Sequence, residues 1–226
     1  MAAVAAAFAV VCSLAGCKNA DPVGEASSTT AASEHGSHLA PPQVRVSQVK
    51  RSGPGPEVGD KWTADVALNV CGQYLEPPAG EAVRGVRANA DGSVEIAPTS
   101  EDEAGHNANL AAYIESIGAE LATGSLKLPA DLKPPEIQVR EDKVAVAGAT
   151  FVDGETCGDV TGKVEVWVYS PEAVKTGDGL VVVAENPQDI PFFADGMALV
   201  VTFTPESSLP TLPPSAALRS SVGSGN

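Results

Sequence analysis

Few side chains in this chain have the type and spacing that catalysis or metal binding requires. His106 is the only histidine within residues 60–205, and the chain has no Gly-x-Ser-x-Gly motif. Both observations disfavour a Ser-His-Asp mechanism. Glu101, Asp102 and Glu103 form an acidic run, but the dipole of a following helix already favours carboxylates there. No EF-hand, P-loop or dinucleotide-binding spacing occurs. The alternative of a catalytic carboxylate pair stays open, because such a pair can be recognised only from the three-dimensional structure.

A cysteine near the N-terminus has a clearer chemical role. Residues 2–16 are uncharged and nearly all small or apolar, and they are typical of a secretory signal because a membrane span needs about 20 residues. The run ends in Leu-Ala-Gly-Cys at 14–17, which resembles the bacterial lipobox, where the Cys17 thiol takes a diacylglycerol and the processed chain gains palmitate. No Lys or Arg precedes the run, which departs from the usual signal pattern. We predict a signal peptide over 1–16; the alternative is a buried apolar helix.

Lipidation at Cys17 would place the chain at the cell membrane, on the side facing away from the cytoplasm. Cys12 leaves with the signal, so the exported body keeps Cys71 and Cys157. A lone pair of cysteines in an oxidising compartment is expected to form a disulfide. Two free buried thiols are the alternative, whereas a redox-active pair is disfavoured because no Cys-x-x-Cys spacing occurs.

Composition divides the rest of the chain into three parts. Residues 17–59 are rich in small and polar residues and are expected to form the lipidated N-terminus and a flexible tether, with 44–49 as a candidate edge strand. Residues 60–205 carry the regular apolar patterns and are expected to fold as one domain. Residues 206–226 are rich in Pro and Ser and are expected to be a loosely held tail.

Strand patterns dominate the body. Strands are predicted over residues 64–70, 83–89, 93–97, 137–139, 144–146, 163–169, 180–184 and 197–204, with hairpin turns at Asp91-Gly92 and Glu141-Asp142.

One helix is predicted over residues 107–121, from apolar residues at helical spacing, with Asn107 as its N-cap and Gly124 as its C-cap. The expected fold class is therefore α+β. It is a mainly antiparallel sheet of short strands with one packed helix, in an order compatible with a β-grasp-like arrangement.

Aromatic residues are the remaining binding candidates, although their share of only 4% of the chain favours their use in the core. Exposed aromatic side chains stack on sugars or anchor a protein partner, whereas buried ones complete the core. Both interpretations are open for the candidates Trp62, Trp167, Tyr169, Phe192 and Phe193.

Several short motifs follow one another through the body. They read Asp-Lys-Trp at 60–62, Val-Cys-Gly-Gln-Tyr-Leu-Glu-Pro-Pro at 70–78, Asp-Gly at 91–92, Gly-His-Asn-Ala-Asn-Leu at 105–110 and Pro-Pro-Ser at 213–215. In this order they resemble an uncharacterised family of exported, membrane-anchored actinobacterial proteins. That family carries His-x-His on both sides of the Asp-Gly turn, which would suit a transition metal. The matching positions here are Arg87, Asn89, Glu95 and Ala97, so the resemblance implies a degenerate metal site without metal.

The charge balance limits the partners. The formal net charge is −15, which repels phosphate backbones and argues against nucleic-acid binding. The sequence therefore favours a cell-envelope lipoprotein without a cofactor. Its non-catalytic domain would bind an envelope protein or a cell-wall component. The alternatives are an envelope hydrolase with an unidentified carboxylate pair, or a degenerate metal-binding module.

Overall fold

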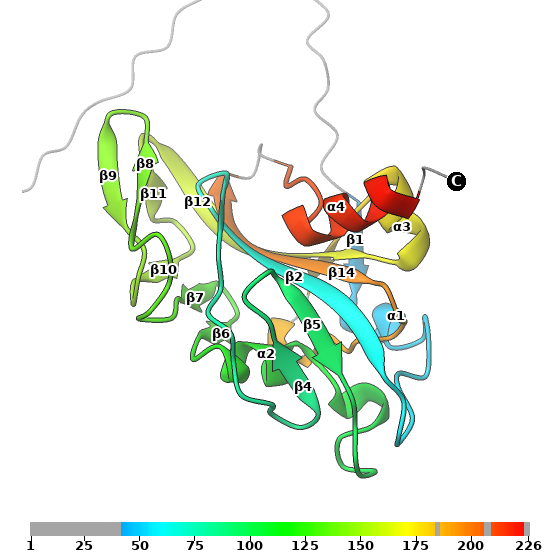
Figure 1. Ribbon diagram of the computed structural model, residues 1–226. Coiled ribbons are helices and arrows are strands. Elements are labelled where there is room, and N and C mark those ends of the chain that lie inside the picture. The colour runs from blue at the N-terminus through cyan, green and yellow to red at the C-terminus, as the bar shows by residue number, and fades with distance from the viewer. Residues whose placement is uncertain (1–41, 184–185, 206–208, 224–226) are drawn as a thin grey trace, which may run out of the picture. The chain divides into compact units, whose positions relative to one another are not determined.

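A long mixed β-sheet forms the centre of the molecule (Figure 1). The computed structural model describes residues 42–183, 186–205 and 209–223. The strands of this sheet are β1 (Gln43–Arg45), β2 (Trp62–Val70), β3 (Gln73–Leu75), β4 (Val86–Ala88), β5 (Ser93–Ile96), β11 (Thr156–Cys157), β12 (Val160–Tyr169), β13 (Leu180–Val183) and β14 (Ala198–Pro205). Their order is β1-β13-β12-β14-β2-β5-β4, while β11 pairs with β12 and β3 pairs with β2. The pairs β1–β13 and β14–β2 are parallel, and the other pairs are antiparallel.

Two small sheets accompany the central one. Their strands are β6 (Glu120–Ala122), β7 (Ser125–Lys127), β8 (Glu136–Val139), β9 (Asp142–Ala145) and β10 (Thr150–Val152). One small sheet has the order β10-β7-β6, and the other is the hairpin β8-β9. In that hairpin Val139 pairs with Asp142, so the turn is made by Arg140 and Glu141, one position earlier than the sequence predicts.

The described helices are short. They are α1 (Val46–Val49), α2 (Leu110–Ser116), α3 (Pro171–Thr176) and α4 (Pro214–Gly223), with the 3₁₀ turns η1 (Gly105–Asn107) and η2 (Pro187–Asp189). None of the helices within the described residues is long and apolar enough to span a bilayer. The predicted α+β class with a mostly antiparallel sheet is confirmed.

The predicted helix over 107–121 is too long. Asn109 rather than Asn107 is the N-cap of α2, because its side chain accepts a hydrogen bond from the Ala112 N–H at 3.2 Å. The helix ends before Gly118, which takes a positive φ of 69° that suits glycine. Leu121 matches the helical spacing but lies in strand β6, where it is buried.

Both ends of the folded region lie outside the predicted limits of 60–205. At the N-terminal end, β1 pairs with β13 at the sheet edge, so part of the predicted tether belongs to the sheet. The predicted edge strand over 44–49 is only β1, and α1 follows it. At the C-terminal end the predicted loose tail contains α4, and Ala216 is fully buried.

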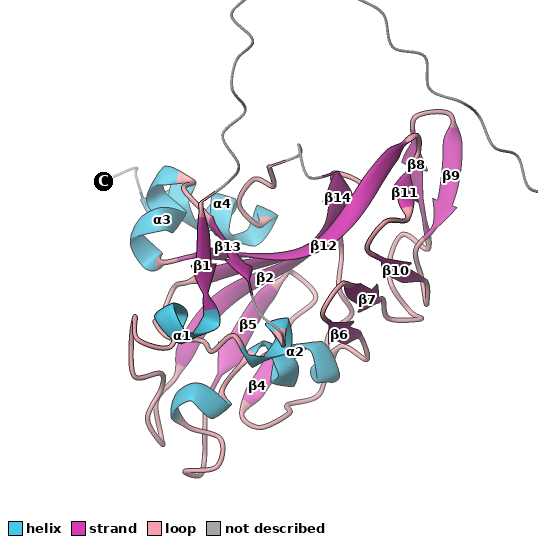
Figure 2. Ribbon diagram, turned by 180° about the vertical axis from the view of Figure 1, so that it is seen from behind, coloured by secondary structure: helices cyan, strands magenta, loops and turns pink. Residues whose placement is uncertain are grey.

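The central sheet is covered on both faces. Both ribbon views show α3 and α4 on one face and α2 on the other (Figures 1 and 2). The α2 face holds the larger core, which includes Val66, Leu68, Val166 and Phe203. The opposite face holds a second cluster of buried residues, which is Trp167, Tyr169, Ala198, Val200 and Ala216.

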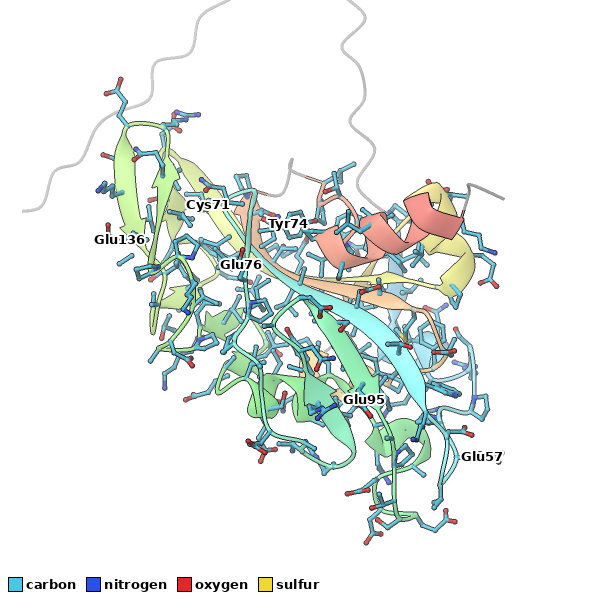
Figure 3. All side chains as sticks on the ribbon, in the orientation of Figure 1. Glu57, Cys71, Tyr74, Glu76, Glu95 and Glu136 are labelled. Carbon is cyan, nitrogen blue, oxygen red and sulfur yellow. A yellow bond between two sulfur atoms is a disulfide. The ribbon has the colours of Figure 1, made fainter. Side chains whose placement is uncertain are left out.

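The predicted disulfide joins Cys71 to Cys157, with their Cα atoms 5.4 Å apart. This Cα separation lies within the usual range for a disulfide. The bond ties the end of β2 to β11, beside the long strand β12 (Figure 3).

Candidate functional site

The hairpin β4–β5 carries the four positions of the implied degenerate metal site. Arg87 lies directly opposite Glu95, and their side chains form an ion pair. The Asn89 side chain bonds to the Ser93 hydroxyl at 3.0 Å, and the Ala97 N–H bonds to the Gly85 carbonyl.

This register corrects the idea that the four positions could converge on one ion. Asn89 and Ala97 lie at opposite ends of the row, on either side of the central pair of Arg87 and Glu95. At about 3.3 Å per residue, these two ends are about 13 Å apart along the strands, beyond the reach of side chains that bind a common ion. Within the described residues, no group of three or more His, Cys, Asp or Glu is placed to hold a metal ion.

The aromatic candidates serve the core. Trp167, Tyr169, Phe192 and Phe193 are at most 7% exposed, so their side chains are packed against other parts of the chain in this structure. Trp62 is half-buried against the larger core. Alternation along β12 correctly places Trp167 and Tyr169 on one face, but it could not show that the second face is covered too.

The lone histidine of the body has a structural contact. His106 Nε2 lies 3.0 Å from the Gly53 carbonyl oxygen and links η1 to the segment before β2. In the acidic run, Glu103 accepts hydrogen bonds from the Thr99 N–H and hydroxyl, which lower the pKa of its carboxyl. Both groups therefore have local bonding roles.

A cavity of about 410 Å³ lies at the β1 edge of the sheet, between α1 and α3. Figure 2 shows both of these helices beside β1. Three stretches far apart in the sequence form this edge cavity, and its lining residues are Val44, Gln48, Val49, Ser52, Val168, Ser170, Pro171, Glu172, Ala173, Asp178, Leu180, Phe193 and Ala194. Its volume lies within the range typical of sites for small ligands.

The edge cavity has an apolar floor and an acidic rim. Val44 aligns with Val182, and Leu180 aligns with Val168, so their side chains share one face of the sheet. Ser170 caps α3 and donates a hydrogen bond to the Glu172 carboxylate at 3.0 Å. The Glu172 backbone N–H and this hydroxyl lower the pKa of the Glu172 carboxyl, which keeps it charged. Among the lining residues, Glu172 and Asp178 carry charge and no Lys or Arg is present.

A second hollow, of about 680 Å³, lies beside α2 and the small sheet β10-β7-β6. Its charged residues neutralise one another, because Arg84 pairs with Glu115 and Lys127 pairs with Glu120. The edge cavity is the stronger candidate, since its charge is not matched within its own lining.

Sequence reasoning missed the edge cavity. Its walls come from β1, the start of α3 and the loop before β14, and no local pattern links these segments. The candidate edge strand over 44–49 was the one available signal, and it did not point to a ligand site.

Several carboxyl groups of the described residues have a displaced pKa. Those of Asp91, Glu103, Asp159 and Glu172 all have a lowered pKa, caused chiefly by hydrogen bonds. A glycosidase-type general acid needs a raised pKa instead.

Comparisons of the chain with known protein families, with curated proteins and with solved structures find no match. The resemblance based on the ordered motifs therefore stays a prediction. Cys17 and the lipobox lie outside the described residues.

Proposed function

We propose that this protein is a cell-envelope lipoprotein, anchored through Cys17 on the outer side of the cell membrane, with a non-catalytic domain that binds a ligand. The lipobox and the disulfide support this placement, because a lone bridged pair of cysteines suits an exported protein.

The edge cavity carries the proposal of ligand binding. Its apolar floor of Val44, Val168 and Phe193 would hold an apolar group, and the carboxylates of Glu172 and Asp178 would attract a positive charge. The ligand class is therefore a small apolar group that carries an ammonium, whether free or part of a cell-wall component or a protein side chain.

A binding role is favoured over hydrolysis. The rim carboxylate of Glu172 has a lowered pKa, so it is suited to holding a cation rather than to donating a proton. A metal-binding role has less support, because the hairpin register separates Asn89 from Ala97.

The test is NMR titration of the full lipidated chain in nonionic detergent with benzylamine and with benzoate, which have similar shapes and opposite charges. We expect benzylamine alone to shift the methyl signals of Val44 and Val168. Glu172→Gln combined with Asp178→Asn should weaken benzylamine binding about tenfold, as expected for two lost charge contacts near the surface. Glu141→Gln, in the exposed β8–β9 turn, is the matched control and should bind normally. Equal binding of both compounds, or of neither, would contradict the proposal.

A further inference from the structure

The C-terminal tail lies across three aromatic side chains on the face of the sheet opposite α2. The tail segment reads Leu-Pro-Thr-Leu-Pro over residues 209–213 and forms neither helix nor strand before α4 begins. The side chains beneath it belong to Tyr74, Trp167 and Tyr169, which we call the aromatic groove. Figure 3 shows Tyr74 close to α4.

Hydrogen bonds from the groove reach the backbone of the tail segment. The Tyr169 hydroxyl donates to the Pro210 carbonyl at 3.0 Å, and the Tyr74 hydroxyl donates to the Thr211 carbonyl. The Thr211 hydroxyl returns a hydrogen bond to Tyr74 Oη at 3.3 Å. Leu212 packs against the second cluster between these contacts and α4.

The aromatic groove presents hydrogen-bond donors, and the backbone of the tail segment presents mainly hydrogen-bond acceptors. Proline has no N–H, so an extended Pro-rich segment presents carbonyl oxygens and apolar rings, and aromatic grooves recognise such segments. Trp167 Nε1 is a third donor in the groove, and it is buried without a hydrogen-bond partner within the described part of the chain. Burial raises the pKa of both Tyr74 and Tyr169, so their hydroxyls stay protonated donors.

The tail segment is only partly buried in this groove. Leu209 is 64% exposed, and Thr211 is also exposed. The buried residues of the tail are Pro213, at the end of the segment, and Ala216 in α4, and both side chains are small. The tail is therefore held by two small buried side chains and the tyrosine hydrogen bonds, together with the high effective concentration that its covalent attachment provides.

We propose that the aromatic groove is a binding site for Pro-rich extended segments of another envelope protein, and that the tail segment occupies it as a built-in competitor. The tail supplies the recognition pattern, a Pro-x-x-Pro at Pro210 and Pro213 with a leucine before the second proline. This site lies on the opposite face of the sheet from the floor of the edge cavity, so it does not depend on the ligand proposed for that cavity, and only the envelope location of the partner rests on the proposed function.

The test measures binding of two fluorescent peptides to the full lipidated chain. One peptide is Leu-Pro-Thr-Leu-Pro-Pro, and the other keeps Pro-x-x-Pro in a different sequence. Leu212→Asp should release the tail and tighten binding of both peptides about tenfold if the tail covers the groove nine-tenths of the time. Leu209→Asp is the matched control, because this exposed leucine of the same segment contributes little to docking. Adding Tyr169→Phe to Leu212→Asp should weaken binding again.

A second measurement does not depend on any variant folding. Millimolar peptide added to the unaltered chain should displace the tail and shift the NMR signals of Leu212 and Ala216. Binding of only the tail's own sequence would reduce the groove to an intramolecular strap and overturn the proposal. Unchanged signals of Leu212 and Ala216, or a released chain that binds no tighter than the unaltered one, would overturn it as well.

Discussion

Removal of the disulfide between Cys71 and Cys157 should cost a large part of the stability of this domain. The two cysteines are 86 residues apart, and closing such a loop in the unfolded chain contributes about 4.6 kcal/mol in the chain-entropy treatment. For a domain of this size each kcal/mol shifts Tm by about 2–4 °C, so reduction should lower Tm by about 9–18 °C.

The assay is urea unfolding of the natively exported protein with and without a reductant. The free energy of unfolding should fall by about 4.6 kcal/mol on reduction, and the m-value should rise because the opened unfolded chain exposes more surface. The double substitution Cys71→Ala with Cys157→Ala should reproduce the loss and add a small packing cost, since Cys157 is 6% exposed.

Reductant added to the double-alanine variant is the control and should change nothing. A loss below about 1 kcal/mol on reduction would refute the loop-closure reasoning, because the constraint on the unfolded chain would then be negligible. Thiols that react with an alkylating agent in the unreduced, unfolded protein would refute the bond itself.

The remaining predictions concern the three tyrosines and the lipid anchor. Burial is the main cause that raises the pKa of Tyr74, Tyr113 and Tyr169, so absorbance at 295 nm should show no phenolate step near pH 10 in the folded protein. Above pH 10 the unfolded state releases protons that the folded state retains, so the free energy of unfolding should fall as pH rises; a phenolate step near pH 10 in the folded protein would contradict this. Tyr113→Phe should raise the free energy of unfolding by about 1 kcal/mol, because the Tyr113 hydroxyl is buried without a partner among the described residues. The matched variant Tyr169→Phe should lower the free energy of unfolding by about 1 kcal/mol, because it loses the hydrogen bond to Pro210. Equal effects of the two variants in urea unfolding would argue against both assignments. Cys17→Ala should move the protein from the membrane fraction to a soluble or unprocessed pool, and normal processing with unchanged membrane partition would count against lipidation.

The sequence predicted correctly those elements whose formation depends on neighbouring residues. The Asp91-Gly92 turn joins β4 to β5, and these two strands pair as predicted, because Gly92 takes the positive φ of 83° that this turn needs. The helix predicted over 107–121 is longer than α2, because apolar residues continue at helical spacing through Leu121 while the helix itself ends before Gly118. The short strands β3, β6, β7, β10 and β11 were missed, because segments this short carry too few alternations to recognise.

The sequence by itself determined the α+β class, the long strands and the partners of the disulfide, because strand alternation and a lone cysteine pair depend on neighbouring residues and residue counts. The tertiary structure alone decided what covers each face of the sheet. Alternation shows that Trp167 and Tyr169 share a face, but the same alternation is compatible with solvent, a partner or the chain's own tail above them. Packing at long sequence separation placed α4 there and assembled the edge cavity from three distant segments.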